Sequence, residues 1–196
     1  TLPSEIHALT SLVSLTVSEN ALTGSIPAMI GLLTRLREFD LQDNDFKGTI
    51  PSEIFQLTQL TFLDLRTNEL TGVIPTEIGQ LIEVETIYLR ENGLTGTLPS
   101  EIGLLSVLES LDIQRNEFVG PLPTEIGQLD SLLFFECMRN NFNSTIPTEI
   151  MKLTNLVNLS FRRNRLTGTI MTEFGFLTKL TRLTFWTNNL TGPIPT

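Results

Sequence analysis

Residues 60–83 read LTFLDLRTNELTGVIPTEIGQLIE, and residues 84–107 repeat the same pattern as VETIYLRENGLTGTLPSEIGLLSV. The period of 24 residues runs through the whole chain. In seven of the eight repeats a glycine recurs at one fixed position, and in the remaining repeat Ser144 takes its place. One asparagine recurs without exception, at Asn20, Asn44, Asn68, Asn92, Asn116, Asn140, Asn164 and Asn188. Self-similarity at this period predicts a solenoid of about eight stacked coils.

Each repeat contains two stretches with strand periodicity. In Leu63-Asp64-Leu65 the apolar residues alternate, which is typical of a half-buried strand, so eight such strands are predicted to form one parallel sheet. Alternation returns at Leu94, Gly96 and Leu98 and predicts a short second strand. The proline that follows, as in Pro75-Thr76-Glu77, ends this strand. The hydroxyl after the proline is expected to cap a short helical turn, and the glutamate favours the N-terminus of that turn.

The asparagine column has a structural explanation. The chain must turn sharply after each strand, which leaves backbone polar groups pointing inward without water. A side-chain amide carries donors and an acceptor, so a column of amides can bond the backbones of neighbouring coils. We therefore predict a structural role for these asparagines.

Composition excludes several functional classes. The net charge of −9 and the pI near 4.6 disfavour binding to nucleic acid or to anionic membranes. One cysteine, Cys137, and one histidine, His7, provide neither a disulfide framework nor a nucleophilic triad. No hydrolase, zinc or phosphate-loop motif is present in the sequence. We therefore predict no catalytic residue, no metal site and no cofactor.

The segments LTGVIPTEIGQL and LTGTLPSEIGLL resemble the plant-type leucine-rich repeat of receptor-kinase ectodomains, receptor-like proteins and polygalacturonase-inhibiting proteins. The resemblance covers the whole chain. It implies an α/β repeat solenoid, a right-handed superhelix with a concave parallel sheet of about eight strands and with short helices on the convex side. It also implies one domain over residues 1–196 and an extracellular or cell-surface location.

Two departures from the family pattern matter. The sequence shows no capping segment with paired cysteines, so open ends and end-to-end self-association are expected, and any membrane attachment would lie outside this chain. The residue that follows the second leucine of each predicted strand also varies from repeat to repeat. Because the repeat leaves the outward strand positions free, these are the predicted ligand contacts: Phe62, Asp64, Arg66, Tyr88, Arg90, Asp112, Gln114, Phe134, Glu136, Arg139, Arg162 and Trp186.

Charge is unevenly distributed along the chain. Residues 1–98 carry 5 basic and 13 acidic side chains, whereas residues 99–196 carry 8 and 9. Near the sheet, Glu19, Asp43, Asp45, Glu69 and Glu91 give way to Arg115, Arg139, Arg162, Arg163 and Arg165. This gradient predicts a bipolar flank that attracts an acidic partner to the second half. The carboxylates at Asp40, Asp64, Asp112 and Glu136 could form a glycosidase-like pair, but salt-linked surface is the favoured interpretation.

The leading functional hypothesis is recognition of a protein, a peptide or a cell-wall glycan by a receptor ectodomain or secreted inhibitor. Three glycosylation sequons, at Asn143, Asn158 and Asn189, favour a secretory history. Ice binding is an alternative, because Thr95-Gly96-Thr97 and Thr167-Gly168-Thr169 place regular hydroxyls on one flank. Adhesion or scaffolding through the open ends or the convex glutamates is a third hypothesis.

Overall fold

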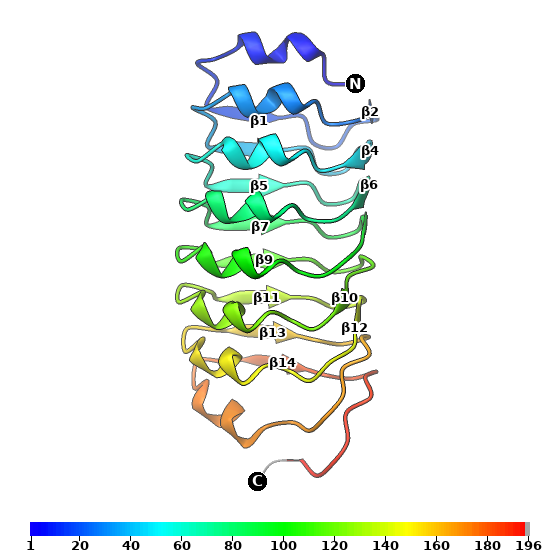
Figure 1. Ribbon diagram of the computed structural model, residues 1–196, viewed down its shortest axis with the longest axis vertical. Coiled ribbons are helices and arrows are strands. Elements are labelled where there is room, and N and C mark those ends of the chain that lie inside the picture. Colours follow the sequence, from blue (N-terminus) through cyan, green and yellow to red (C-terminus); the bar gives the residue numbers. More distant parts are fainter. Residues whose placement is uncertain (195–196) are drawn as a thin grey trace.

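The computed structural model describes residues 1–194, so Pro195 and Thr196 of the expected domain lie outside the described residues. One parallel sheet runs through the molecule with each strand joined to the next coil in a register of 24 residues, for example Leu63 beside Ile87 (Figure 1). This confirms the predicted stack of coils. In the described part of the chain its strands are β1 (Ser14–Thr16), β3 (Glu38–Asp40), β5 (Phe62–Asp64), β7 (Thr86–Tyr88), β9 (Ser110–Asp112), β11 (Phe134–Glu136), β13 (Asn158–Ser160) and β14 (Arg182–Thr184).

The predicted second strands form at one side of the coils. They pair as one sheet of β2 (Thr23–Gly24), β4 (Asp45–Thr49), β6 (Glu69–Gly72) and β8 (Gly93–Leu94), and as a separate pair of β10 (Val119–Gly120) and β12 (Asn141–Phe142). Gly96 shows why glycine recurs here: its φ is +76°, and a Cβ would lie 2.7 Å from Cγ1 of Val73 in the preceding coil. Past Ser144, which replaces this glycine, the pairing is an isolated bridge between Thr145 and Thr167, and β8 and β10 do not pair although both coils keep the glycine.

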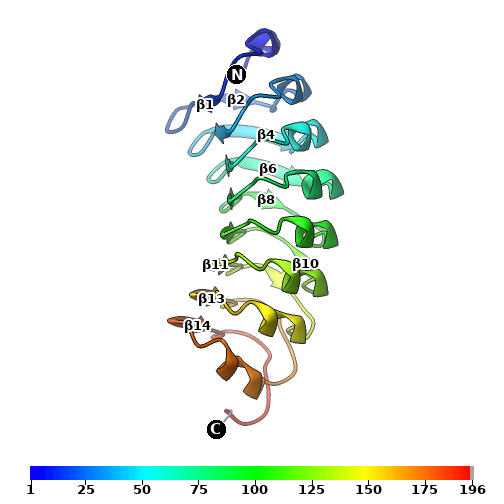
Figure 2. The same ribbon diagram turned by 90° about the vertical axis from the view of Figure 1, so that its left-hand side faces the viewer.

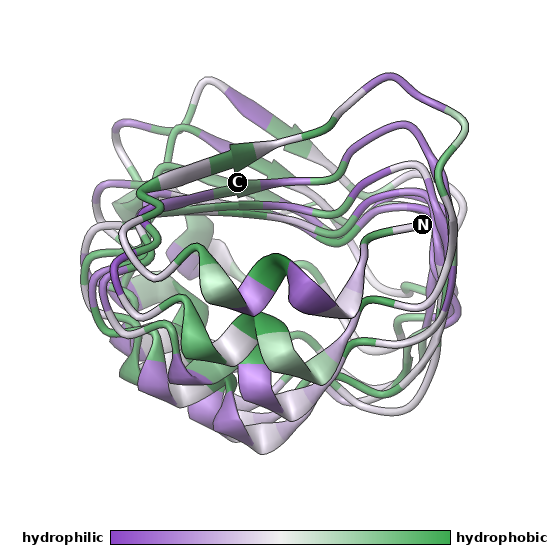
Figure 3. Ribbon diagram, turned by 90° about the horizontal axis from the view of Figure 1, so that it is seen from above, coloured by the Kyte–Doolittle hydropathy of each residue, from purple (hydrophilic) through white to green (hydrophobic). Residues whose placement is uncertain are grey.

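A short 3-10 helix completes each coil on the face opposite the large sheet, as Figures 2 and 3 show. The helices of the described residues are η1 (Ser4–Ala8), η2 (Ala28–Leu32), η3 (Ser52–Gln56), η4 (Thr76–Gln80), η5 (Ser100–Leu104), η6 (Thr124–Gln128), η7 (Thr148–Lys152) and η8 (Thr172–Phe176). Within residues 1–194, no helix has the length and apolar character needed to cross a membrane.

The predicted hydroxyl cap of these helices is wrong. The cap position belongs to the residue before the hydroxyl, such as Pro99 before Ser100, and it makes no side-chain cap bond. Because Ser100 is already the first helical residue, its hydroxyl donates instead to the carboxylate of Glu101 at 3.2 Å. Thr124, Thr148 and Thr172 form the corresponding bond to the next glutamate.

The core fills the space between the sheet and the helices. The leucine and isoleucine columns are buried in the interior coils, and the second half adds stacked rings, as between Phe118 and Phe142 at a centroid distance of 6.2 Å. Members of these columns become exposed at the ends of the stack, where Leu9 is 54% exposed. Apolar burial over many coils is the main stabilising contribution.

The asparagine column clamps successive coils together, as predicted. Nδ2 of Asn116 donates to the carbonyl oxygens of Leu89 at 2.9 Å and Ile113 at 3.2 Å. Its Oδ1 accepts the backbone N–H of Leu94 at 3.0 Å. Leu89 and Leu94 lie before and after the turn of the preceding coil, so one side chain satisfies both sides of that turn.

Candidate functional site on the concave face

The residue before each asparagine forms a regular rim along one edge of the large sheet. All eight residues of this column have positive φ, between 52° and 60°, and we call them the rim: Glu19, Asp43, Thr67, Glu91, Arg115, Arg139, Arg163 and Thr187. Backbone bonds stack them one per coil; the N–H of Arg139, for example, donates to the carbonyl of Arg162 at 3.0 Å. The turn therefore places one rim side chain in each coil, and these side chains are spaced by the distance between neighbouring strands.

Charge on the rim changes sign along the stack. Its acidic members lie in the first four coils and its arginines in the next three. Glu91 and Arg115 meet at the boundary in an ion pair. The three residues Asp45, Glu69 and Arg165, which the sequence grouped with the rim, lie past the asparagine turn instead, and Glu69 pairs with Lys47 at 3.1 Å.

The arginine part of the rim is electrostatically strained. The neighbouring guanidinium of Arg163 lowers the pKa of Arg139, and burial together with Arg115 and Arg162 acts in the same direction. Among the described residues, Arg139 and Arg163 make no ion pair with a carboxylate. This part of the surface therefore carries uncompensated positive charge in a chain that is acidic overall.

An aromatic cluster occupies the middle of the concave face, by which we mean the outward side chains of the large sheet. Phe62 meets Tyr88 edge to face with centroids 6.0 Å apart, and the guanidinium of Arg66 lies 5.0 Å from the centre of the Tyr88 ring. Nε of Arg66 also donates to Oε1 of Gln42 at 2.7 Å. These contacts hold three predicted ligand contacts in one cluster.

The prediction that Asp64 is an outward contact needs correction. Its side chain is fully buried, and Oδ2 lies 3.0 Å from Nε of Arg66. Its Oδ1 accepts the backbone N–H of Arg66 at 3.1 Å, and Asp40 and Asp112 form the same bond two residues ahead, to Gln42 and Gln114. These aspartates therefore hold the strand ends, and Asp64 offers no surface to a ligand.

Burial raises the pKa of Asp64 to about 6, and it also raises the pKa of Asp112 and of Glu136. A carboxyl whose folded pKa is raised stabilises the fold while it is protonated and loses this contribution as pH rises through the folded pKa. For Asp64 the loss falls between the ordinary value of 3.8 and about 6.

We expect the free energy of unfolding of the wild type to fall, relative to that of Asp64→Asn, by up to about 2 kcal/mol between pH 4 and pH 7. Urea denaturation followed by circular dichroism at several pH values measures this difference. Parallel pH profiles for the two proteins would show that the carboxyl titrates normally.

The second half of the concave face contains a hollow of about 440 Å³. Trp186 forms one wall and is 49% exposed; the guanidinium groups of Arg162 and Arg163 lie 4.7 Å and 5.1 Å from its ring. Glu136, which lines the hollow, accepts a hydrogen bond from Nδ2 of Asn158 at 2.5 Å. The lining residues are Gln114, Glu136, Met138, Ser160, Arg162, Arg182, Thr184 and Trp186.

The structure brings only some predicted contacts together. Gln114, Glu136, Arg162 and Trp186 line the hollow, whereas Phe134 is a separate exposed ring and Arg90 pairs with Glu91 at 3.1 Å. Sequence reasoning missed Met138, Ser160, Arg182 and Thr184 as lining residues. Ser160 and Thr184 occupy the same repeat column as Asp112 and Glu136, so the period could have identified them.

The three sequons differ in accessibility. Asn143 and Asn189 are exposed. Asn158 is half-buried, and its amide nitrogen, the atom that a glycan would modify, already bonds Glu136. A glycan at Asn158 would therefore break its contact with Glu136, which lines the hollow.

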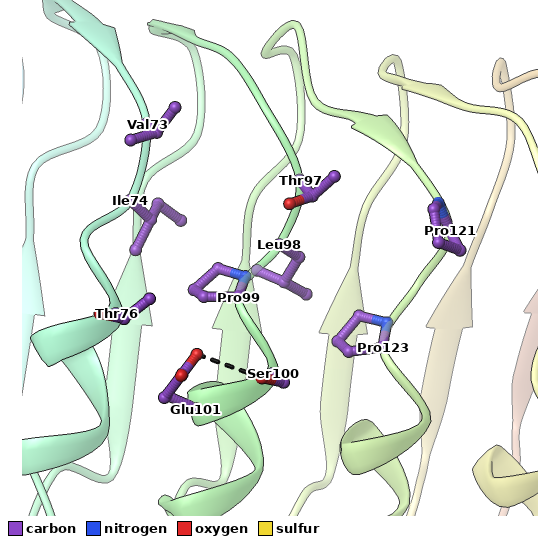
Figure 4. Close-up of a pocket in the computed structure, with 10 residues that line it drawn as sticks. All are labelled: Val73, Ile74, Thr76, Thr97, Leu98, Pro99, Ser100, Glu101, Pro121 and Pro123. Atoms are coloured by element: carbon purple, nitrogen blue, oxygen red, sulfur yellow. Dashed lines mark hydrogen bonds between the residues drawn. The ribbon is translucent and has the colours of Figure 1, made fainter.

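A second hollow, of about 540 Å³, lies on the flank beside the second strands and the helices (Figure 4). Its walls are mainly apolar, from Val73, Ile74 and Leu98 together with three prolines, and its Ser100 and Glu101 bond each other. The threonine columns run along this flank and are interrupted by Lys47, Val119, Pro121, Asn143 and Pro193. Across the described residues, no group of three or more His, Cys, Asp or Glu side chains is placed to hold a metal ion.

Comparison with known proteins places the chain in a family. A model described as a leucine-rich repeat region matches residues 76–192, and a leucine-rich-repeat model matches residues 35–57 and 59–81. No curated protein matches the chain significantly.

Solved structures share this architecture. The plant peptide hormone receptor RGFR1, solved in complex with RGF2, is 34% identical with a TM-score of 0.95, over 96% of this chain and 30% of the receptor chain. The Arabidopsis receptor kinase HAESA, solved with the peptide hormone IDA and the co-receptor SERK1, is 31% identical with a TM-score of 0.93, over 99% and 33%. A plant ice-binding protein is 27% identical with a TM-score of 0.80, over 99% and 70%.

The chain spans about a third of the length of the two receptor chains. The matched family model covers more than half of the chain, and the 24-residue register, the asparagine column and the sheet agree with it. The chain therefore belongs to the leucine-rich-repeat family, in its plant-type form.

Proposed function

We propose that this chain is a non-catalytic extracellular recognition module that binds a peptide or protein ligand through its concave face. The observation that carries the proposal is the hollow lined by Trp186, Arg162 and Arg182, on the same face as the Phe62–Tyr88 cluster. Tryptophan, tyrosine and arginine on a rigid scaffold are the residue types that dominate protein recognition.

The comparisons support this proposal by analogy. The receptors named above were solved with peptide hormones, and a further similar structure is the ectodomain of a plant membrane receptor kinase. An ectodomain faces the outside of the cell, and the exposed sequons at Asn143 and Asn189 are compatible with that location. The proposal treats the chain as one continuous binding domain. A cell-wall glycan is the second ligand class proposed for the concave face.

Selection from a displayed random-peptide library against the immobilised chain tests the proposal. We expect enriched peptides whose affinity falls about tenfold in Tyr88→Ala and in Trp186→Ala, since truncated hot-spot aromatics typically cost more than 1 kcal/mol. Val119→Ala removes an exposed apolar side chain from the flank and serves as the matched control. Peptides that lose affinity only in the flank variant, or a selection without enrichment, would contradict the proposal.

Ice binding is a second candidate, favoured by the threonine columns and by the similar plant ice-binding structure. In two neighbouring coils of the flank, the hydroxyls of Thr71 and Thr95 donate to the glycine carbonyl of the preceding coil at 3.4 Å and 3.2 Å. These bonds hold the side chains in a repeating orientation. A thermal-hysteresis assay separates the two functions, because concave-face substitutions would leave ice binding unchanged.

A further inference from the structure

The rim and the hollow make the two ends of the concave face different in charge. At one end of the rim, Glu19 and Asp43 are exposed, and neither forms an ion pair within the described part of the chain. At the other end lie Arg139 and Arg163, next to the hollow that holds Arg162 and Trp186. The two ends therefore present opposite charges to one elongated ligand.

Within the described residues, no acidic residue of the second half forms an ion pair with Arg139 or Arg163. Four of these acidic residues lie in the first turn of a helix, on the face opposite the sheet (Figure 2): Glu101, Glu125, Glu149 and Glu173. Glu136 is half-buried, lines the hollow and bonds Asn158. The mutual repulsion of Arg139 and Arg163 persists in the unliganded chain, and an anionic group placed between them would relieve it.

We propose that the concave face binds an extended peptide of asymmetric charge in a single orientation, with its acidic end at Arg139 and Arg163 and its basic end toward Glu19 and Asp43. This proposal rests on the proposed function and specifies its ligand class. From Asp43 to Arg163 the rim advances five coils, which at about 4.8 Å per strand gives about 24 Å, the length of about seven extended residues.

The sole tryptophan provides a direct reporter of orientation, because Trp186 lies at the arginine end beside Arg163. The probe is a ten-residue peptide with two glutamates at one end, two lysines at the other and serine and glycine between them. It is made in two forms, with a nitroxide quencher at the acidic or at the basic end. We expect saturable quenching of Trp186 from the acidic end and at least threefold less from the basic end.

Substitutions test the residues themselves. Arg139→Asn and Arg163→Asn remove the charges but keep a residue that tolerates positive φ, so the turn survives. The double variant should bind the peptide about tenfold more weakly at low salt, and the wild-type affinity should fall as salt rises. Lys152→Gln removes an exposed charge from the last turn of η7 and should change the affinity less than twofold.

Several results would overturn the inference. They are equal quenching from both ends, equal binding of a peptide in which glutamine and serine replace the charged residues, and unchanged affinity in the double variant. Dextran sulfate binding that depends on the two arginines without peptide binding would assign the rim to a polysaccharide instead. If library selection yields neutral peptides that still require Tyr88 and Trp186, this inference fails while the proposed function stands.

Discussion

Asn116→Ala is expected to lower the free energy of unfolding by about 3 kcal/mol, because it leaves one buried N–H without a partner, at about 1–3 kcal/mol, and removes one donor from each of two buried carbonyls. The N–H of Leu94 loses its bond, whereas the carbonyls of Leu89 and Ile113 keep their bonds to Asn92 and Asn140. Alanine supplies no polar atom, and the side chain of Asn116 lies inside the stack, where water does not replace it. Urea denaturation followed by circular dichroism measures the loss.

Asn20→Ala is the matched control. Asn20 occupies the same repeat position in the first coil, where it is exposed and bonds only the carbonyls of Val17 and Ser18 in its own coil. Water can replace these bonds, so we expect a loss of less than about 1 kcal/mol. Equal losses at the two positions would mean that the asparagine acts within its own coil and does not clamp the neighbouring one.

Gly103→Ala is expected to destabilise the chain by about 3 kcal/mol, at the upper end of what overpacking usually costs. A Cβ at Gly103 would lie 2.5 Å from the carbonyl oxygen and 2.7 Å from the Cβ of Glu125. Both atoms belong to the next helix, η6, and neither sits at the end of a flexible side chain. The neighbouring coils would therefore have to separate, which the thermal unfolding midpoint and urea denaturation would both report.

Gly175→Ala provides the contrasting variant. Gly175 occupies the equivalent position in η8, and a Cβ there would meet no atom within 4 Å. Alanine restricts the unfolded chain, so this variant should be neutral or more stable by about 0.4–1 kcal/mol. A comparable destabilisation at both glycines would show that helix propensity, rather than contact between coils, decides this position.

Both experiments probe contacts between coils, which are the contacts that the period of the sequence predicts best. A residue that must satisfy its neighbour 24 positions away recurs at that spacing, as Asn116 does in every repeat. The Gly103 column is less strict, because His7, Phe55 and Met151 occupy the equivalent positions of three coils. The helix cap was predicted incorrectly because Ser100 matches the residue types of a capping motif but lies one position inside the helix. The exact first residue of so short a helix depends on the path of the chain out of the second strand.

The repeat pattern also predicted part of the candidate site. The variable outward columns identified Trp186, Arg162 and Glu136, which line the hollow. They also suggested Asp64, whose burial depends on Arg66 lying across it toward Tyr88, an arrangement made by side chains of two neighbouring coils. Periodicity assigns a residue to a face, whereas the rotamers of its neighbours decide whether it stays accessible.

The solenoid, the register of its strands, the asparagine clamp and the family all follow from the 24-residue period, because each depends on one residue and its counterpart in the next coil. The period does not predict which outward side chains are covered, where the hollow forms, or that the charged rim follows a column of residues with positive φ. Exposure depends on how side chains of several neighbouring coils pack against one another, and these are the positions at which the repeats differ.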